Sequence, residues 1–76
     1  MEAARQAWER AFQGYIPRKG TKQVCPVGDR PLRTLGQVVR IPLYNEDGTL
    51  DGFYDLAVSR THVFGVWRGA IWEAPL

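Results

Sequence analysis

The sequence predicts one small α+β domain, in which an N-terminal helix packs on a strongly bent antiparallel β-meander of four or five strands. Apolar residues recur at helical spacing over residues 2–13, and they alternate at strand spacing over residues 38–74. Glycine-containing turns divide the second stretch into short segments, as expected for consecutive hairpins. A small SH3-like barrel is one form that such a bent sheet can take.

The chain has 76 residues, which is close to the lower size at which a hydrophobic core alone can stabilise a domain. Hydrophobic residues make up 45% and charged residues 24%, so the composition is that of a globular protein and not of a disordered one. No apolar run approaches the ~18 residues of a membrane span, and the N-terminal stretch has no signal-peptide pattern. We therefore expect a single domain, residues 1–76, in a cytoplasmic protein.

Residues 2–13 are expected to form the helix. Its apolar stripe consists of residues at positions i, i+4, i+7, i+8 and i+11, namely Ala4, Trp8, Ala11, Phe12 and Tyr15. Gly14 suits the position after a helix C-terminus, and Pro17 prevents further helix. Because so short a helix needs tertiary packing, we expect its Trp8 and Phe12 side to face the sheet.

A basic loop is expected over residues 14–21, and a short edge strand over residues 22–27. Pro26 favours the edge of the sheet, because proline has no N–H to donate to a neighbouring strand. Cys25 is the only cysteine, so no intrachain disulfide can form. We expect Cys25 to be a small apolar residue of this strand.

The register of the β-meander, residues 38–74, follows from turns at residues 45–48, 59–60 and 68–69. The resulting pairs include Leu43 with Leu50, Leu56 with Val63, and Trp67 with Ala70. Ten apolar residues then share one face, the predicted core face: Val39, Ile41, Leu43, Leu50, Tyr54, Leu56, Val58, Val63, Trp67 and Trp72. Gly52 and Gly65 lie on the same face, where they could admit large aromatic side chains.

Four acidic residues lie close together in the sequence: Glu46, Asp47, Asp51 and Asp55. Asp51 and Asp55 are about 13 Å apart on one strand, which is too far to share a proton or a metal ion. Asp47, Thr49, Asp51, Gly52 and Asp55 match five positions of an EF-hand calcium loop, but Val58 stands where a bidentate Glu is needed. We interpret these acids as a polar hairpin turn and outer strand face, and we expect no metal ion and no cofactor.

Enzyme activity is the function class that the sequence favours least. Any histidine-based catalysis would depend on His62, the only histidine. A pair of Cys25 and His62 would lack an evident activating third group. No glycine-rich phosphate loop precedes a helix, and no metal-ligand spacing occurs.

The face opposite the predicted core face carries a second apolar set, the outer stripe, formed by Arg40, Phe53, Phe64, Val66 and Ile71. Charged residues and a histidine surround it: Asp51, Asp55, His62 and Glu73. Such a surface is either covered within the domain, here by the helix, or offered to a partner. Our hypothesis is a non-enzymatic binding or regulatory protein that docks a protein partner, or a second copy, through the outer stripe.

The basic segment of residues 18–40 provides the alternative, a nucleic-acid-binding module. It contains six basic residues, Arg18, Lys19, Lys22, Arg30, Arg33 and Arg40, and one acid, Asp29. Binding to phosphates needs Arg and Lys on one surface, often with aromatic residues for stacking, and Tyr15 and Tyr44 are candidates. The net charge of only +2 and the acidic stretch that follows weaken this alternative.

The stretch VRIPLYNEDGTLDGF, residues 39–53, with WRGAI at residues 67–71, is similar to fragments of the two motifs of Sm-like proteins. Only twelve residues separate Asp55 from Arg68, and the hairpin glycine spacing is one residue short of that pattern. We therefore carry no RNA-binding residues over from this similarity.

Overall fold

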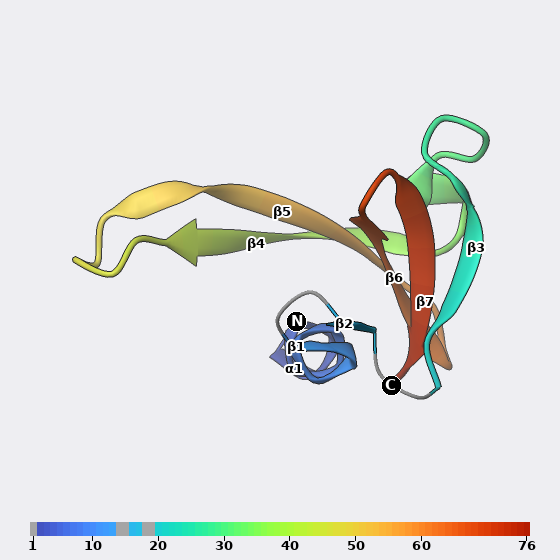
Figure 1. Cartoon of the computed structure of the whole chain (residues 1–76), viewed down its shortest axis with the longest axis horizontal. Coiled ribbons are helices and arrows are strands. Elements are labelled where there is room, and N and C mark those ends of the chain that lie inside the picture. The colour runs from blue at the N-terminus through green and yellow to red at the C-terminus, as the bar shows by residue number, and fades with distance from the viewer. Residues whose placement is uncertain (1, 14–15, 18–19) are drawn as a thin grey trace.

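The computed structural model of the chain has one N-terminal helix and a five-stranded antiparallel sheet, so the predicted α+β class is confirmed. It describes residues 2–13, 16–17 and 20–76. The first elements are the helix α1 (Glu2–Ala11) and the short strands β1 (Phe12–Gln13) and β2 (Ile16–Pro17), which pair with each other. The sheet comprises β3 (Lys22–Pro26), β4 (Gln37–Tyr44), β5 (Leu50–Val58), β6 (His62–Trp67) and β7 (Ala70–Pro75), as Figure 1 shows.

The strand order is β3-β7-β6-β5-β4, so the meander of the last four strands is extended beyond β7 by β3. Strands β3 and β4 form the two edges and do not pair with each other, which leaves the sheet open. Closure into an SH3-like barrel is therefore not confirmed. A 3₁₀ helix, η1 (Leu32–Thr34), lies between the two edge strands in the chain. Of the helices described, none has the length and apolar character needed to cross a membrane.

Helix α1 packs on the predicted core face of the sheet. The buried residues of this first cluster are Ala4, Ala7, Trp8, Ala11, Ile41, Leu56, Val58, Val63 and Ala74. Three of the four helix residues in it are alanines, so the helix can approach the sheet closely and Trp8 supplies most of the apolar surface on the helix side. Full burial of one large apolar side chain contributes about 1.5–3 kcal/mol, so this interface is a main source of stability.

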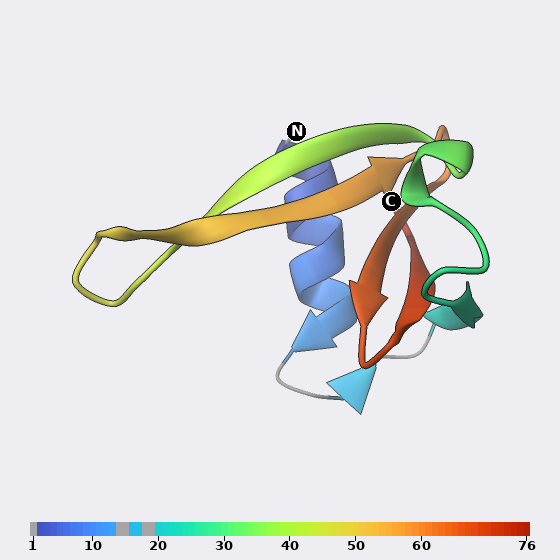
Figure 2. The same cartoon turned by 90° about the horizontal axis from the view of Figure 1, so that it is seen from above.

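Eight of the ten residues predicted for the core face lie in this cluster or pack against it. The two exceptions are Leu43 and Leu50, which are 42% and 52% exposed. The reason is the direction in which α1 crosses the sheet. Figure 1 shows α1 end-on and Figure 2 shows it running across the β4–β5 hairpin, so the length of α1 does not extend along the hairpin. A helix with its side chains is about 10–12 Å wide, whereas the nine residues of β5 extend over about 30 Å. Figures 1 and 2 show the distal end of the β4–β5 hairpin continuing past α1.

The predicted register is confirmed for one hairpin and wrong for two. The confirmed pairs are Trp67 with Ala70, Gly65 with Trp72, and Val66 with Ile71. The corrected pairs include Leu43 with Gly52 and Val58 with Val63. In both hairpins the observed register differs from the predicted register by two residues. Since side chains alternate between faces with a period of two, each strand still presents its predicted face to the core.

The two errors have separate local causes. The first turn is closed by Asn45, whose N–H donates to the Thr49 carbonyl at 2.8 Å, and this moves the register by one residue from the predicted one. A β-bulge next to the turn moves it by one residue more. The second turn is closed by Ser59, whose N–H donates to the His62 carbonyl at 2.9 Å. Its central residues are therefore 60–61, one position later than predicted, and this moves the register by two.

A second cluster lies on the other face of the sheet. Its buried residues are Ala57, Phe64 and Ile71, and the partly buried residues packed against them are Val24, Cys25, Leu32, Leu35 and Val66. The segment from β3 through η1 therefore covers this face, while α1 covers the opposite one. Each face of the sheet has its own cover near β6 and β7.

Substitution of Gly65 tests the close contact between α1 and the sheet. A Cβ atom at Gly65 would lie 2.6 Å from Cζ2 of Trp8 and 2.9 Å from Cδ2 of Leu56. We expect Gly65→Ala to lower the free energy of unfolding by about 1–3 kcal/mol, because Trp8 must move out of its packed position.

Gly52→Ala is the matched control, since a Cβ there would meet no atom within 4 Å. Its free energy of unfolding should stay unchanged or rise by up to about 1 kcal/mol. Urea denaturation of both variants checks the prediction, and equal losses would contradict the described contact between Trp8 and Gly65.

Candidate binding surfaces

The structure separates the five residues of the predicted outer stripe. Phe64 and Ile71 are only 8% and 2% exposed, and Val66 is half-buried against them. Arg40 and Phe53, by contrast, are exposed on the β4–β5 hairpin. The expectation of one continuous exposed stripe is therefore wrong. Cover by the helix is also wrong, because the side chains packed on this face come from β3, where the sequence predicted an edge strand, and from Leu32 and Leu35, for which the sequence predicted no element.

The exposed remainder of the outer stripe is organised around Arg40. Its Nε donates to Oδ1 of Asp55 at 3.1 Å, and its guanidinium carbon lies 5.7 Å from the centre of the Phe53 ring. Arg40 and Asp55 are directly opposite each other in the β4–β5 register. An exposed ion pair adds little stability, but here it orients the guanidinium next to the aromatic ring.

Exposed apolar side chains are concentrated on this hairpin. The large hydrophobic residues exposed in the described part of the chain are Val27, Val38, Leu43, Tyr44, Leu50, Phe53 and Leu76, and five of these seven lie on β4 or β5. Four of the five fall within residues 42–53, which we call the arm. Phe53 lies on the same face as Arg40 and Asp55, and Leu43 lies on the side that faces α1.

One acidic residue of the arm, Asp47, stabilises its turn. The Asp47 carboxylate accepts hydrogen bonds from the N–H and the hydroxyl of Thr49, at 2.9 Å and 2.6 Å. Asn45 Nδ2 donates to the same hydroxyl at 3.0 Å. The side-chain hydrogen bond from Thr49 is the leading cause that lowers the pKa of Asp47 below its ordinary value of 3.8. Asp47 thus lies in the turn, where the sequence placed it, and its hydrogen bonds to Thr49 are a feature that the sequence did not predict.

The structure does not bring the other reactive side chains together. In the part of the chain described, no three residues among His, Cys, Asp and Glu form a group that could hold a metal ion. Cys25 is half-buried opposite Ile71, and His62 lies opposite Pro75. These two positions on β7 are four residues apart, so about 13 Å separates the neighbourhoods of Cys25 and His62.

The four basic residues of the nucleic-acid alternative that the structure describes do not form one group. Lys22 lies opposite Glu73 at one end of β3, and Arg40 is paired with Asp55. Arg30 and Arg33 are exposed in the segment beyond the other end of β3 (Figure 1). Arg18, Lys19 and the stacking candidate Tyr15 lie outside the described residues. Tyr44 is exposed on the arm. Nucleic-acid binding remains a prediction.

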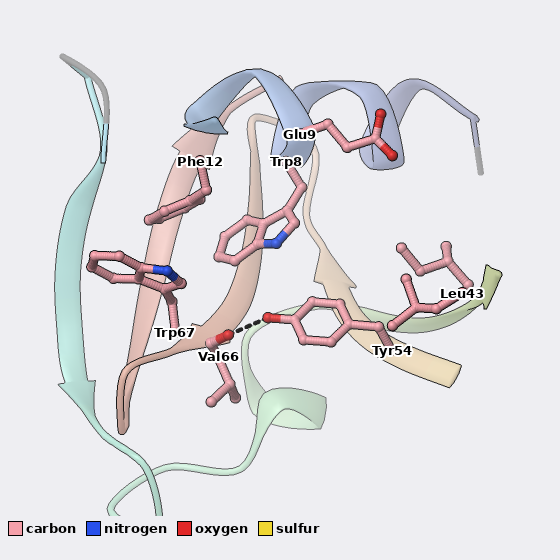
Figure 3. Close-up of a pocket in the computed structure, with 8 residues that line it drawn as sticks. Trp8, Glu9, Phe12, Leu43, Tyr54, Val66 and Trp67 are labelled. Carbon is pink, nitrogen blue, oxygen red and sulfur yellow. Dashed lines mark hydrogen bonds between the residues drawn. The ribbon is translucent and has the colours of Figure 1, made fainter. Parts of the chain in front are cut away.

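A groove of about 310 Å³ lies between α1 and the sheet. The residues that line it are Trp8, Glu9, Phe12, Ile41, Leu43, Tyr54, Val66 and Trp67. Figure 3 shows Trp8 at its centre, Tyr54 on one side, and Phe12 and Trp67 on the other. The ring centre of Trp8 is 4.3 Å from that of Phe12 and 6.3 Å from that of Tyr54.

Tyr54 is held in the groove by its hydroxyl, which donates to the Val66 carbonyl (Figure 3). Burial raises the pKa of Tyr54 above its ordinary value of 10.0, so the phenol stays protonated near neutral pH. The sequence assigned these aromatic residues to the core, and nothing in their spacing indicated that a groove would remain between helix and sheet.

Substitution of the two outer-stripe phenylalanines tests their different environments. We expect Phe64→Ala to lower the free energy of unfolding by about 3 kcal/mol, because it leaves a cavity in the second cluster. Phe53→Ala should cost less than about 1 kcal/mol, since the ring is 57% exposed. Chemical denaturation measures both, and a loss at Phe53 as large as that at Phe64 would contradict this division of the stripe.

The turn of the arm predicts a pH dependence. With its pKa lowered in the folded state, ionised Asp47 adds stability above its ordinary pKa of 3.8, and this is lost as pH falls through the lowered value. Thr49→Val removes the hydroxyl donor, so the pKa of Asp47 should rise toward 3.8. NMR titration of the Asp47 carboxyl group measures this, with Thr61→Val as a control that should leave the pKa of Asp47 unchanged.

Comparisons of the chain with protein-family models, with characterised proteins and with solved structures find no match. A functional proposal for this chain therefore rests on the geometry of its own surfaces, above all on the arm and on the groove beside α1.

Proposed function

We propose that the chain is a non-enzymatic, cytoplasmic binding protein that docks a protein partner through the arm, with Phe53 at the centre of the contact. The observation that carries this proposal is the concentration of exposed apolar side chains on one projecting hairpin. Of the seven large hydrophobic residues exposed in the described part, five belong to β4 and β5. The proposal does not require the sheet to close into a barrel.

The energetics of the arm favour a partner. A two-stranded ribbon is only marginally stable in water when nothing covers it. Tyr44 and Phe53 are 65% and 57% exposed, and since each aromatic side chain can bury 150–250 Å², together they offer roughly 200 Å² of contact. A standard protein interface takes about 800 Å² from each partner. These two rings would supply its anchors, with Arg40 and Asp55 beside Phe53 on the same face of the hairpin.

The polar neighbours of Phe53 fit the edge of such an interface. Arg40 and Asp55 lie beside the ring and are already paired with each other, so a partner does not have to remove an unpaired charge from water. The Arg40 guanidinium is also directed toward Phe53 before binding, which reduces the entropy lost when the partner docks.

The open backbone edge of β4 is less suited to binding. Pro42 lies in the middle of β4 and has no N–H, so an added strand would lack one hydrogen bond there. Proline on an edge strand also protects a sheet against unwanted pairing. We therefore propose that the partner docks on the side chains of the arm and does not add a strand to β4.

Phe53→Asp should abolish partner binding and leave the fold intact. Val27→Asp is the matched control, because Val27 is similarly exposed, at 50% against 57%, and lies outside the arm. Size-exclusion chromatography with light scattering, at low and high salt, tests self-association. If the wild type is a monomer, capture from nuclease-treated host lysate tests a different protein partner.

The expected result is binding by the wild type and Val27→Asp and none by Phe53→Asp, with the same circular dichroism spectrum for all three. Unfolding of Phe53→Asp would show that Phe53 is part of the core and would refute the proposal. Equal binding by both variants would also refute it, because the arm would then not be the contact. Capture that nuclease treatment abolishes would favour nucleic acid.

A further inference from the structure

The groove beside α1 has a chemistry that differs from that of the arm. Four of its lining residues are aromatic, namely Trp8, Phe12, Tyr54 and Trp67. Glu9 is the only charged residue among them. We infer that this groove binds an organic cation whose charge is carried by an alkylated nitrogen, a quaternary ammonium group being the simplest example.

The aromatic lining and the acid both favour a positive charge. The faces of aromatic rings attract cations, by about 0.5–1 kcal/mol at exposed sites and about 2 kcal/mol where water is excluded. The Glu9 side chain is 61% exposed and adds a negative charge at one end of the groove (Figure 3). Its pair with Arg5 is an exposed contact of 3.4 Å within one helix, and such pairs interact weakly. Among the residues that the structure describes, neither Lys nor Arg lines the groove.

One ring of this aromatic lining, that of Trp67, already contacts a cation of the chain. The guanidinium carbon of Arg68 lies 4.7 Å from the centre of the Trp67 ring. Arg68 does not line the groove, so this contact is made at its border. A ligand in the groove would extend the same kind of interaction to the rings of Trp8 and Tyr54.

The scarcity of hydrogen-bond acceptors selects an alkylated nitrogen over a primary amine. A primary ammonium group carries three N–H donors, and each donor that leaves water unpaired is costly. The Tyr54 hydroxyl and the Val66 carbonyl already bond to each other, so Glu9 is the main remaining acceptor. A quaternary ammonium group has no donors to satisfy. The volume of about 310 Å³ suits a small head group, at the lower end of known ligand pockets.

The test compares choline with two related molecules. One is the neutral alcohol in which a tert-butyl group replaces the trimethylammonium group, and the other is ethanolamine, which carries a primary ammonium. Binding is followed by tryptophan fluorescence and by the indole NMR signals of Trp8 and Trp67. We expect saturable choline binding that moves both indole signals, with affinity about ten-fold weaker for the neutral alcohol and weaker still for ethanolamine.

Single substitutions separate the contribution of the Glu9 charge from nonspecific apolar binding. Glu9→Gln should weaken choline binding about three-fold and leave binding of the neutral alcohol unchanged. Glu46→Gln removes an acid in the turn of the arm and should change neither affinity. Phe53→Asp should bind choline like the wild type, so failure of the arm proposal and failure of this one are distinguishable.

Three results would overturn the inference. One is the absence of saturable choline binding below about 10 mM. Another is a neutral alcohol that binds as tightly as choline, since the groove would then be simply apolar. The last is an equal effect of Glu9→Gln and Glu46→Gln, which would show that the acid beside the groove does not contact the ligand.

Discussion

The contact of Trp8 with Gly65 determines the arrangement of the rest of the domain. The edge of the indole ring lies so close to Gly65 that even a methyl group there would come within 2.6 Å of it. Three alanines bring the helix backbone near the sheet, and Trp8 then fills the space left by the absent side chain. This fixes α1 over β6 and the inner part of β5. Apolar residues of the sheet that α1 does not reach must be covered by another element or stay exposed to solvent.

Two short segments, one on each face, cover a sheet that extends beyond both of them. Helix α1 covers one face, and the β3–η1 segment covers the other with Leu32 and Leu35. Both lie toward the β6 and β7 end, and neither extends to the tip of the β4–β5 hairpin (Figures 1 and 2). The exposed side chains of the arm are thus a direct consequence of how the two covers are placed.

The sequence was informative wherever a local pattern decides the structure. Alternation identified the face of eight core residues, even though two registers were wrong, because both errors were even numbers of residues. Leu32 and Leu35 gave no usable signal, since they lie between a turn and a strand and follow neither period. As a result the burial of Phe64 and Ile71 was missed. The groove could not be predicted either, because it depends on where α1 comes to rest on the sheet.

Leu43 connects the two proposed surfaces. It belongs to the arm, it is 42% exposed, and it also lines the groove beside Glu9. The proposed partner contact is centred on Phe53, on the opposite face of the arm from Leu43. Coupling between the two proposed sites would therefore require a partner that also reaches around the hairpin to Leu43. Because such linkage is reciprocal, a ligand that strengthens partner binding must itself bind more tightly when the partner is present. The two proposed surfaces therefore share one side chain, and any coupling between them would have to pass through Leu43.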